Sequence, residues 1–245
     1  MVSLALDTST AGGSTAVRRG GVLLAERSGP PDVPHARRLP RELVLTLDEA
    51  RVELKDVTLF AVSSGPGAFT GLRIGIATQQ GLAFATARPL VGVSSLDALA
   101  HAALERNDLP TVPLIAVWMD AARGEVFTAL YARGPDAALS LVDEPAAASA
   151  ASTVERWTTL VAGRPILCVG DGAIRYRGHL HAAFDDAVIA PGTPRLAGTI
   201  ARLAEVAAAR RDAAGPEGIR PLYVRRPDAE LVRDRRLREP APERP

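Results

Sequence analysis

The chain has 245 residues, of which 47% are hydrophobic, and its formal net charge is +1. This length and apolar content are sufficient for one large hydrophobic core or two modest ones. The near-neutral charge excludes a strongly basic protein that holds nucleic acid by bulk electrostatics, and the single cysteine, Cys168, excludes an internal disulfide.

The N-terminal stretch MVSLALD has no basic residue, and Asp7 interrupts its apolar run early. A secretory signal peptide needs a basic start and a longer apolar segment, so none is expected here. No stretch reaches the roughly 18 uncharged apolar residues of a membrane span. A lone cysteine is typical of a reducing compartment. We therefore expect a cytoplasmic protein that contacts no membrane.

Short apolar runs bounded by glycine and proline predict the strands of the first half, and apolar residues at helical spacing predict its helices. The expected strands are 2–7, 14–19, 22–28, 58–63 and 89–93, and the expected helices are about 36–51, 70–86 and 96–105.

The stretch SSGPGAFTGLRIG, residues 63–75, joins a predicted strand to the next helix. A P-loop needs a lysine after its glycines, and Lys55 is the only lysine in the chain. The dinucleotide fingerprint fails as well, because Thr70 stands at its third glycine position. Pro66 and Gly67 instead predict a type II turn with a positive φ at Gly67, and Thr70 is a suitable helix N-cap. We expect this loop to shape the chain without binding phosphate.

The second half repeats the order of the first: three strands, helix, strand, helix, strand, helix. Its expected strands are 114–120, 125–132, 138–144, 165–170 and 187–190, and its expected helices are about 153–161, 173–183 and 195–210. We predict an N-terminal lobe at 1–108, a C-terminal lobe at 109–225 and a tail at 226–245. The tail is rich in proline and charge, a composition typical of disorder.

A duplicated βββαβαβα unit, with Asp7 and Asp120 ending the first strand of each half, resembles the actin/Hsp70/sugar-kinase (ASKHA) superfamily. The resemblance implies a two-lobed α/β fold with mixed sheets. Several stretches narrow it to the TsaB (YeaZ) family over residues 1 to about 225. They are LALDTST, HARRLPRELVLTLDEA, SSGPGAFTGLRIGIATQQGLA, PLVGVSSLDALA, MDAARGEVFTALY, VGDG and PLYVR.

The resemblance implies a non-catalytic scaffold or activator subunit of the complex that installs threonylcarbamoyl on adenosine 37 of tRNA. Its expected partner is a TsaD-like catalytic subunit, with a TsaE-like ATPase joining through the complex and tRNA contacted only indirectly. No catalytic residue and no cofactor is expected in this chain, because ATP would be held by the partner subunits. Whether the chain alone is a monomer or a homodimer, and whether the arginine-rich tail touches tRNA, stay open.

The TsaD-like paralogue carries two histidines four residues apart on its first helix, where they hold a metal. Here His35 stands near the matching place, but the residue four further on is Leu39. One imidazole is a poor metal site, so none is predicted. Asp7 is the candidate for nucleotide contact, and the alternative function is a small ASKHA-type phosphotransferase that uses Asp7 with Mg-ATP. A metallopeptidase is a third reading, which the missing histidine pair disfavours.

Small residues recur at i+4 on the helix after residue 69, with Gly71 and Gly75 on one ridge and Ala77, Gly81 and Ala85 on another. Such ridges allow a neighbouring backbone to come close, and the resemblance implies that the first two helices contact the TsaD-like subunit. Which ridge faces the partner stays open. Arg73 lies in the first turn, where a cation is disfavoured, which suggests an anionic partner. The predicted interface residues are Leu43, Leu47, Gly71, Arg73, Ile74, Gly75, Thr78, Gly81 and Leu82.

Overall fold

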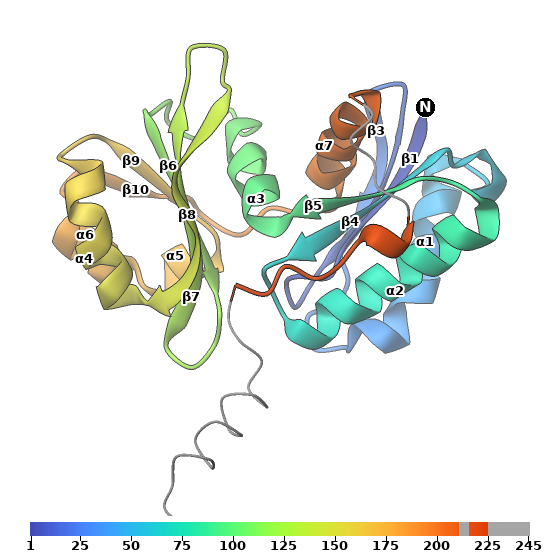
Figure 1. The fold of residues 1–245 in the computed structure, drawn as a ribbon, viewed down its shortest axis with the longest axis horizontal. Helices are drawn as coiled ribbons and strands as arrows, with labels where there is room; N and C mark the ends of the chain where they lie inside the picture. Colours follow the sequence, from blue (N-terminus) through green and yellow to red (C-terminus); the bar gives the residue numbers. More distant parts are fainter. Residues whose placement is uncertain (211–215, 225–245) are drawn as a thin grey trace, which may run out of the picture.

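The computed structural model describes residues 1–210 and 216–224, so the tail predicted at 226–245 lies outside the described residues. The chain forms two lobes, each built on a five-stranded sheet (Figure 1). The first lobe contains β1 (Val2–Asp7), β2 (Ser14–Arg19), β3 (Val22–Arg27), α1 (His35–Ala50), η1 (Leu54–Asp56), β4 (Leu59–Gly65), α2 (Phe69–Thr86), β5 (Leu90–Ser94) and α3 (Ser95–Leu104).

The first sheet has the order β3-β2-β1-β4-β5. Strand β1 pairs antiparallel with β2 and parallel with β4, so the sheet is mixed. Helices α1 and α2 cover one face of it, and the C-terminal helix α7 (Ala197–Ala209) covers the other. Strands β1 and β4 are therefore buried on both faces, which explains their nearly continuous apolar sequences.

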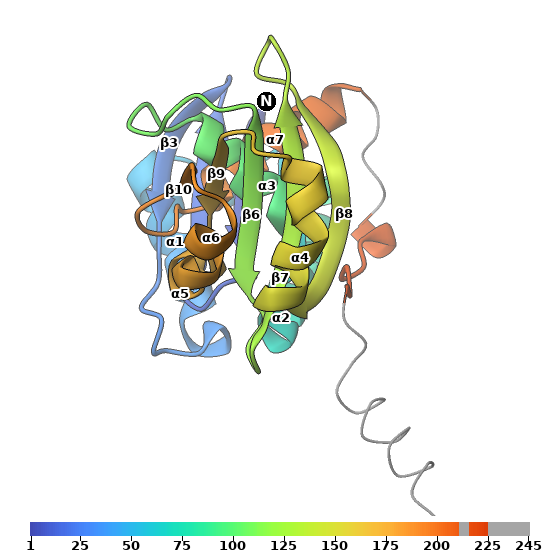
Figure 2. The same cartoon turned by 90° about the vertical axis from the view of Figure 1, so that its left-hand side faces the viewer.

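The second sheet repeats this arrangement in the order β8-β7-β6-β9-β10. Its lobe contains β6 (Leu114–Asp120), β7 (Glu125–Arg133), β8 (Leu139–Ser149), α4 (Ala150–Val161), β9 (Ile166–Val169), α5 (Asp171–Arg175), α6 (Arg177–Ala183) and β10 (Ala187–Ile189). Figure 2 shows α4 and α6 covering the outer face of this sheet. The duplicated unit and the two-lobed α/β fold are confirmed.

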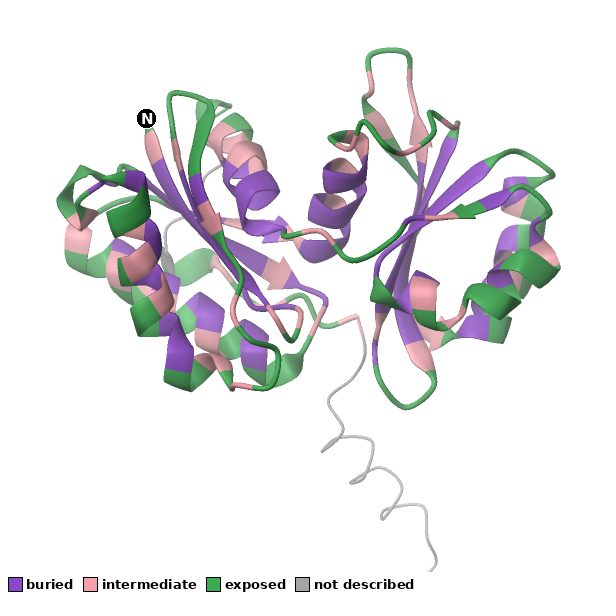
Figure 3. Cartoon of the chain, turned by 180° about the vertical axis from the view of Figure 1, so that it is seen from behind, coloured by how far each residue is buried: buried purple, intermediate pink, exposed green. Residues whose placement is uncertain are grey.

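Two helices lie between the sheets, and each of them packs against the sheet of the other lobe. Helix α7 packs against β1, β2 and β4, although it follows the last strand of the second sheet, and α3 packs against β6 and β9. Glu105, just after α3, accepts hydrogen bonds from the Thr199 hydroxyl at 3.0 Å and the Arg202 Nε at 2.7 Å. Buried residues run through both sheets and the inner turns of these helices (Figure 3). None of the described helices is long and apolar enough to cross a membrane.

Three local predictions were wrong. Helix α2 begins at Phe69 with Ala68 as its N-cap residue, so Thr70 does not cap it. The positive φ of the preceding loop, 109°, belongs to Gly65 and not to Gly67. The single helix expected at 173–183 is two short helices, α5 and α6, which meet at Tyr176.

Candidate functional site

A cleft of about 630 Å³ opens between the lobes at the carboxyl ends of the central strands. Parallel pairing of β1 with β4, and of β6 with β9, brings the polar residues that follow these strands to one edge of each sheet. Open α/β sheets bind ligands at such edges, so the groups here are the first candidates for chemistry. The lining residues are Ser9, Thr10, Ala11, 66–70, 119–122, Phe127, Asp171 and 222–224.

Asp7, the predicted nucleotide candidate, ends β1 and is buried. Its Oδ1 accepts hydrogen bonds from the backbone N–H of Ser9 at 2.9 Å and from the Ser9 hydroxyl at 2.6 Å. Its Oδ2 accepts a longer bond, 3.4 Å, from the Thr10 hydroxyl. The carboxylate thus holds the loop that follows its own strand, and both oxygens face groups of that loop.

The acids of the second lobe are also engaged locally. Asp171 Oδ1 accepts from the backbone N–H groups of Asp120 and Gly172, each at 2.9 Å. Asp120 accepts from the Ala122 N–H at 3.2 Å through Oδ1 and from Arg175 at 2.6 Å through Oδ2. These bonds fix the loops after β6 and β9, and Met119 and Phe127 add apolar surface to the lining of the cleft.

His35, at the first residue of α1, contacts the loop that Asp7 organises. Its Nε2 lies 3.0 Å from the Thr10 carbonyl oxygen, and its Nδ1 lies 2.8 Å from a guanidinium nitrogen of Arg38. Since an arginine can only donate, Nδ1 accepts and Nε2 carries the proton. Burial, followed by the charge of Arg38, lowers the pKa of His35 below its usual value. Both nitrogens of the neutral ring are therefore engaged within the protein.

Four residues further along α1, Leu39 is buried in the core of the first lobe. No group of three or more His, Cys, Asp or Glu side chains gathers as a metal site within 1–210 and 216–224. His179 is exposed on α6 and stacks edge-on against Tyr176, with ring centroids 6.0 Å apart. His101 is half-buried on α3, where burial and the charge of Arg202 lower its pKa.

Arg38 is buried and ties α1 to the loop between β1 and β2, a role that sequence reasoning missed. One terminal nitrogen donates to the carbonyl oxygens of Ala11 at 2.9 Å and Gly12 at 2.6 Å. The other pairs with both carboxylate oxygens of Glu42, at 2.7 and 2.8 Å, and Nε donates to the Val33 carbonyl. The available sequence signal was the Arg-to-Glu spacing of four residues in HARRLPRE, typical of a helical ion pair.

The Gly71/Gly75 ridge of α2 faces this protein's own β1 loop. A Cβ at Gly71 would lie 2.2 Å from the Thr8 carbonyl oxygen, and one at Gly75 would lie 2.1 Å from the Thr8 hydroxyl. Both distances are far below van der Waals contact, so only glycine fits at these positions. This close packing is internal, and these two predicted interface residues do not lie on the open side of α2.

The other ridge of α2 is open. Ala77, Gly81 and Ala85 are exposed, and a Cβ at Gly81 would meet no atom within 4 Å. Val44 on α1 and Phe84 on α2 are large exposed apolar residues that sequence reasoning missed. Among the predicted interface residues, Leu43 is buried, Leu47, Ile74, Thr78 and Leu82 are half-buried, and Arg73 and Gly81 are exposed.

Arg73 contacts aromatic groups. Its Nε donates to the Tyr223 hydroxyl at 3.0 Å, and its guanidinium lies 4.0 Å from the centroid of the Phe69 ring. No ion pair joins Arg73 to an acid among the described residues. The anionic partner predicted for Arg73 therefore remains a prediction.

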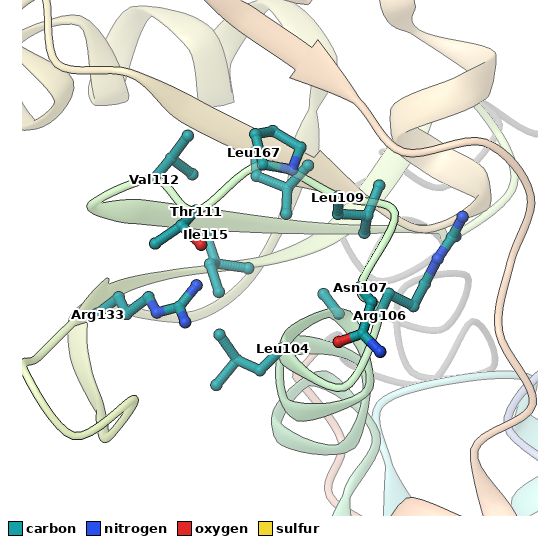
Figure 4. Close-up of a pocket in the computed structure, with 11 residues that line it drawn as sticks. Leu104, Arg106, Asn107, Leu109, Thr111, Val112, Ile115, Arg133 and Leu167 are labelled. Atoms are coloured by element: carbon teal, nitrogen blue, oxygen red, sulfur yellow. The ribbon is translucent and has the colours of Figure 1, made fainter.

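A second, smaller cavity of about 180 Å³ lies by the segment that joins α3 to β6 (Figure 4). Figure 4 shows Leu104, Leu109, Val112, Ile115 and Leu167 around it, with Arg106 and Arg133 at opposite sides. Arg106 is bound to the Asp108 carboxylate and the Pro191 carbonyl. The Arg106 guanidinium at this cavity is thus already bonded within the protein. We therefore place the candidate site at the cleft and at α2.

The chain is similar to proteins that are named for the threonylcarbamoyladenosine modification of tRNA. The family model described as TsaD, tRNA N6-adenosine threonylcarbamoyltransferase, matches residues 32–231. The tRNA threonylcarbamoyladenosine biosynthesis protein TsaB of Escherichia coli is 38% identical over 130 residues, which are 53% of this chain and 54% of that protein. An uncharacterized protein of Mycobacterium bovis is 32% identical over 230 residues, 92% of each chain.

Among solved structures, YeaZ from Pseudomonas aeruginosa matches with a TM-score of 0.74 and 32% identity. That match covers 91% of this chain and 99% of the other. The chain spans about half the length of the E. coli TsaB protein, 54%, and nearly all of the Pseudomonas structure.

Proposed function

This chain belongs to the family of tRNA N6-adenosine threonylcarbamoyltransferases and their TsaB (YeaZ) relatives, and from that premise we propose that it is a non-catalytic subunit of the threonylcarbamoyltransferase complex. In this role it binds a TsaD-like catalytic subunit through α1 and α2 and supports its activity. A TsaE-like ATPase joins through the complex, and tRNA is contacted by the other subunits.

The observation that carries the proposal is the open ridge of α2. Gly81 has no packing use among the described residues of this chain, although glycine costs up to about 1 kcal/mol relative to alanine in a helix interior, and the small side chains of Ala77 and Ala85 keep the surface on either side of it low. A partner helix packed closely on this ridge offsets that cost. Phe84 lies next to this ridge on α2 and is exposed, as is Val44 on α1, and exposed apolar surface is typical of interaction sites.

The contacts of His35 and Asp7 support an accessory role. A catalytic TsaD-like subunit would need a second histidine where Leu39 is buried in the core. The Asp7 carboxylate is engaged with Ser9 and Thr10, which disfavours the alternative phosphotransferase.

Reconstitution tests the proposal. The chain should co-purify with a TsaD-like catalytic subunit, and tRNA modification by the remaining subunits should fall when this chain is omitted. Unchanged modification without the chain contradicts the proposal. Calorimetry with Mg-ATP distinguishes the phosphotransferase, because tight binding that Asp7→Ala abolishes would favour that enzyme instead.

A further inference from the structure

A C-terminal segment runs along the side of α2 that faces β4 and β5. We call residues 219–224 the strap; it runs beside α2 in Figure 1. The Gln80 amide donates to the Ile219 carbonyl at 3.1 Å, and the Leu222 N–H donates to the Ser64 carbonyl at 2.6 Å. The strap is thereby held at its first residue to α2 and at Leu222 to the end of β4.

Two glycines of the first lobe lie against the strap. A Cβ at Gly65 would lie 2.9 Å from the Leu222 carbonyl oxygen, and one at Gly92 would lie 3.2 Å from the Ile219 side chain. Real Cβ atoms almost never approach to the first distance, and the second is tighter than ordinary contact. Gly65 of β4 and Gly92 of β5 thus allow the strap to approach the first lobe closely.

Although the strap is bonded to the first lobe, two of its large side chains are partly exposed to solvent. Leu222 is 42% exposed and Tyr223 is 40% exposed, beside Phe69, which is 41% exposed. The rings of Phe69 and Tyr223 lie 5.3 Å apart, and Arg73 bonds to one and stacks on the other. We call Phe69, Arg73 and Tyr223 the aromatic cluster. Tyr and Arg are among the residue types enriched at the few positions that dominate binding energy at interfaces.

The aromatic cluster is continuous with the open ridge of α2. Arg73, Ala77, Gly81 and Ala85 follow one another at i+4, so they lie along one side of the helix. A partner helix lying on the small residues would reach Arg73 at the N-terminal end of α2. Within the described residues no carboxylate pairs with the Arg73 guanidinium, and its terminal nitrogens can receive one.

We propose that the strap and the aromatic cluster form one end of the partner surface, where Arg73 takes a carboxylate from a helix of the catalytic subunit. This rests on the proposed function and adds the strap and the aromatic cluster, and it makes the anionic partner predicted for Arg73 a carboxylate on the partner's helix. Tyr223 is a positioning residue here, because it holds the Arg73 guanidinium against Phe69.

The test is titration calorimetry of the full chain with a TsaD-like catalytic subunit. Arg73→Ala and Tyr223→Ala should each weaken binding tenfold or more, and the double variant should lose less than the sum of the two. Added salt should weaken the wild type more than Arg73→Ala, since the charge pair is screened. Val206→Ala, a residue of similar exposure at 43% on α7, is the matched control and should bind as the wild type.

If the wild type binds and both cluster variants bind equally well, the inference is wrong while the proposed function stands. If the wild type does not bind the catalytic subunit, both fail. If the variants lose only self-association in sedimentation, the surface belongs to a second copy of this chain and the inference is overturned.

Discussion

Arg38 joins α1 to the loop between β1 and β2 through the carbonyl groups of Ala11 and Gly12, and it also bonds to the Val33 carbonyl and the Glu42 carboxylate. Arg38→Leu would leave these acceptors and the half-buried Glu42 without their donor. Removing one partner of a buried ion pair costs about 3–5 kcal/mol, so we expect a loss of this size in urea unfolding. Arg37→Leu changes the exposed neighbour and should stay within about 0.5 kcal/mol of the wild type. Equal losses in the two variants would contradict this role of Arg38.

His35 makes stability depend on pH. Its folded-state pKa lies below the ordinary value of 6.5, because burial and Arg38 disfavour the charged ring. The unfolded chain therefore takes up the proton first, and stability falls as pH drops from about 6.5 toward the folded-state pKa. Above about pH 6.5 the contribution is complete.

His35→Gln isolates this effect, since glutamine can donate to Thr10 and accept from Arg38 without titrating. Urea unfolding at about pH 7.5 and about pH 5.5 should show a smaller acid loss in the variant than in the wild type. The pKa of His101 is also lowered, but its effect on the acid loss is the same in the variant and the wild type and cancels in the comparison. Identical acid losses would show that His35 is not held neutral.

At the scale of elements, α2 presents two glycines with opposite surroundings. Gly75→Ala places a methyl against the buried Thr8 hydroxyl, and such overpacking typically costs about 1–3 kcal/mol. Gly81→Ala meets open space and should stabilise the helix by up to about 1 kcal/mol. Thermal unfolding of both variants measures the difference. A destabilising Gly81→Ala would mean that this side of α2 is covered in the isolated chain.

Strand and helix order was predictable because the buried strands β1, β4 and β6 are nearly continuous apolar runs. Ends were less predictable. Strand β8 continues through Pro145 to Ser149, where a proline suggests an end, because edge strands tolerate the missing N–H. Thr70 is a good cap by composition, but the N-cap position lies two residues earlier at Ala68, whose N–H bonds to the Ser9 carbonyl. Tertiary contacts decide such ends.

The candidate site was only partly predictable. The i+4 spacing revealed both ridges of α2, but the spacing alone could not show that Gly71 and Gly75 pack on Thr8. That contact depends on where the β1 loop lies in space. Tyr223 is about 150 residues from Arg73, and no local pattern links them. The contact of the strap with α2 therefore could not be predicted from the sequence.

At the scale of the whole molecule, the two lobes are interlocked. We keep the lobe limits of 1–108 and 109–225 as a proposal, with α7 and the strap returning to the first lobe. Without α7, the inner face of β1, β2 and β4 would be exposed, so residues 1–108 alone should not fold. The exchange of α3 and α7 predicts one cooperative unfolding transition.

The positions of the tryptophans make this testable. Trp118 and Trp157 lie in the second lobe, with ring centroids 5.5 Å apart. Tryptophan fluorescence therefore reports the second lobe, while far-UV circular dichroism reports the whole chain. The two urea curves should coincide. Separate midpoints would show that the lobes unfold independently.

The central claim is that the open side of α2 binds a TsaD-like catalytic subunit. The affinity of that subunit for Gly81→Trp, measured by calorimetry, tests it most directly. Gly178→Trp is the matched control, since Gly178 is also helical, exposed and without a neighbour within 4 Å of its Cβ position, but lies on α6 of the other lobe. We expect Gly81→Trp to fold normally and bind at least tenfold more weakly, with Gly178→Trp unchanged. Equal, wild-type affinity in both variants would contradict the claim.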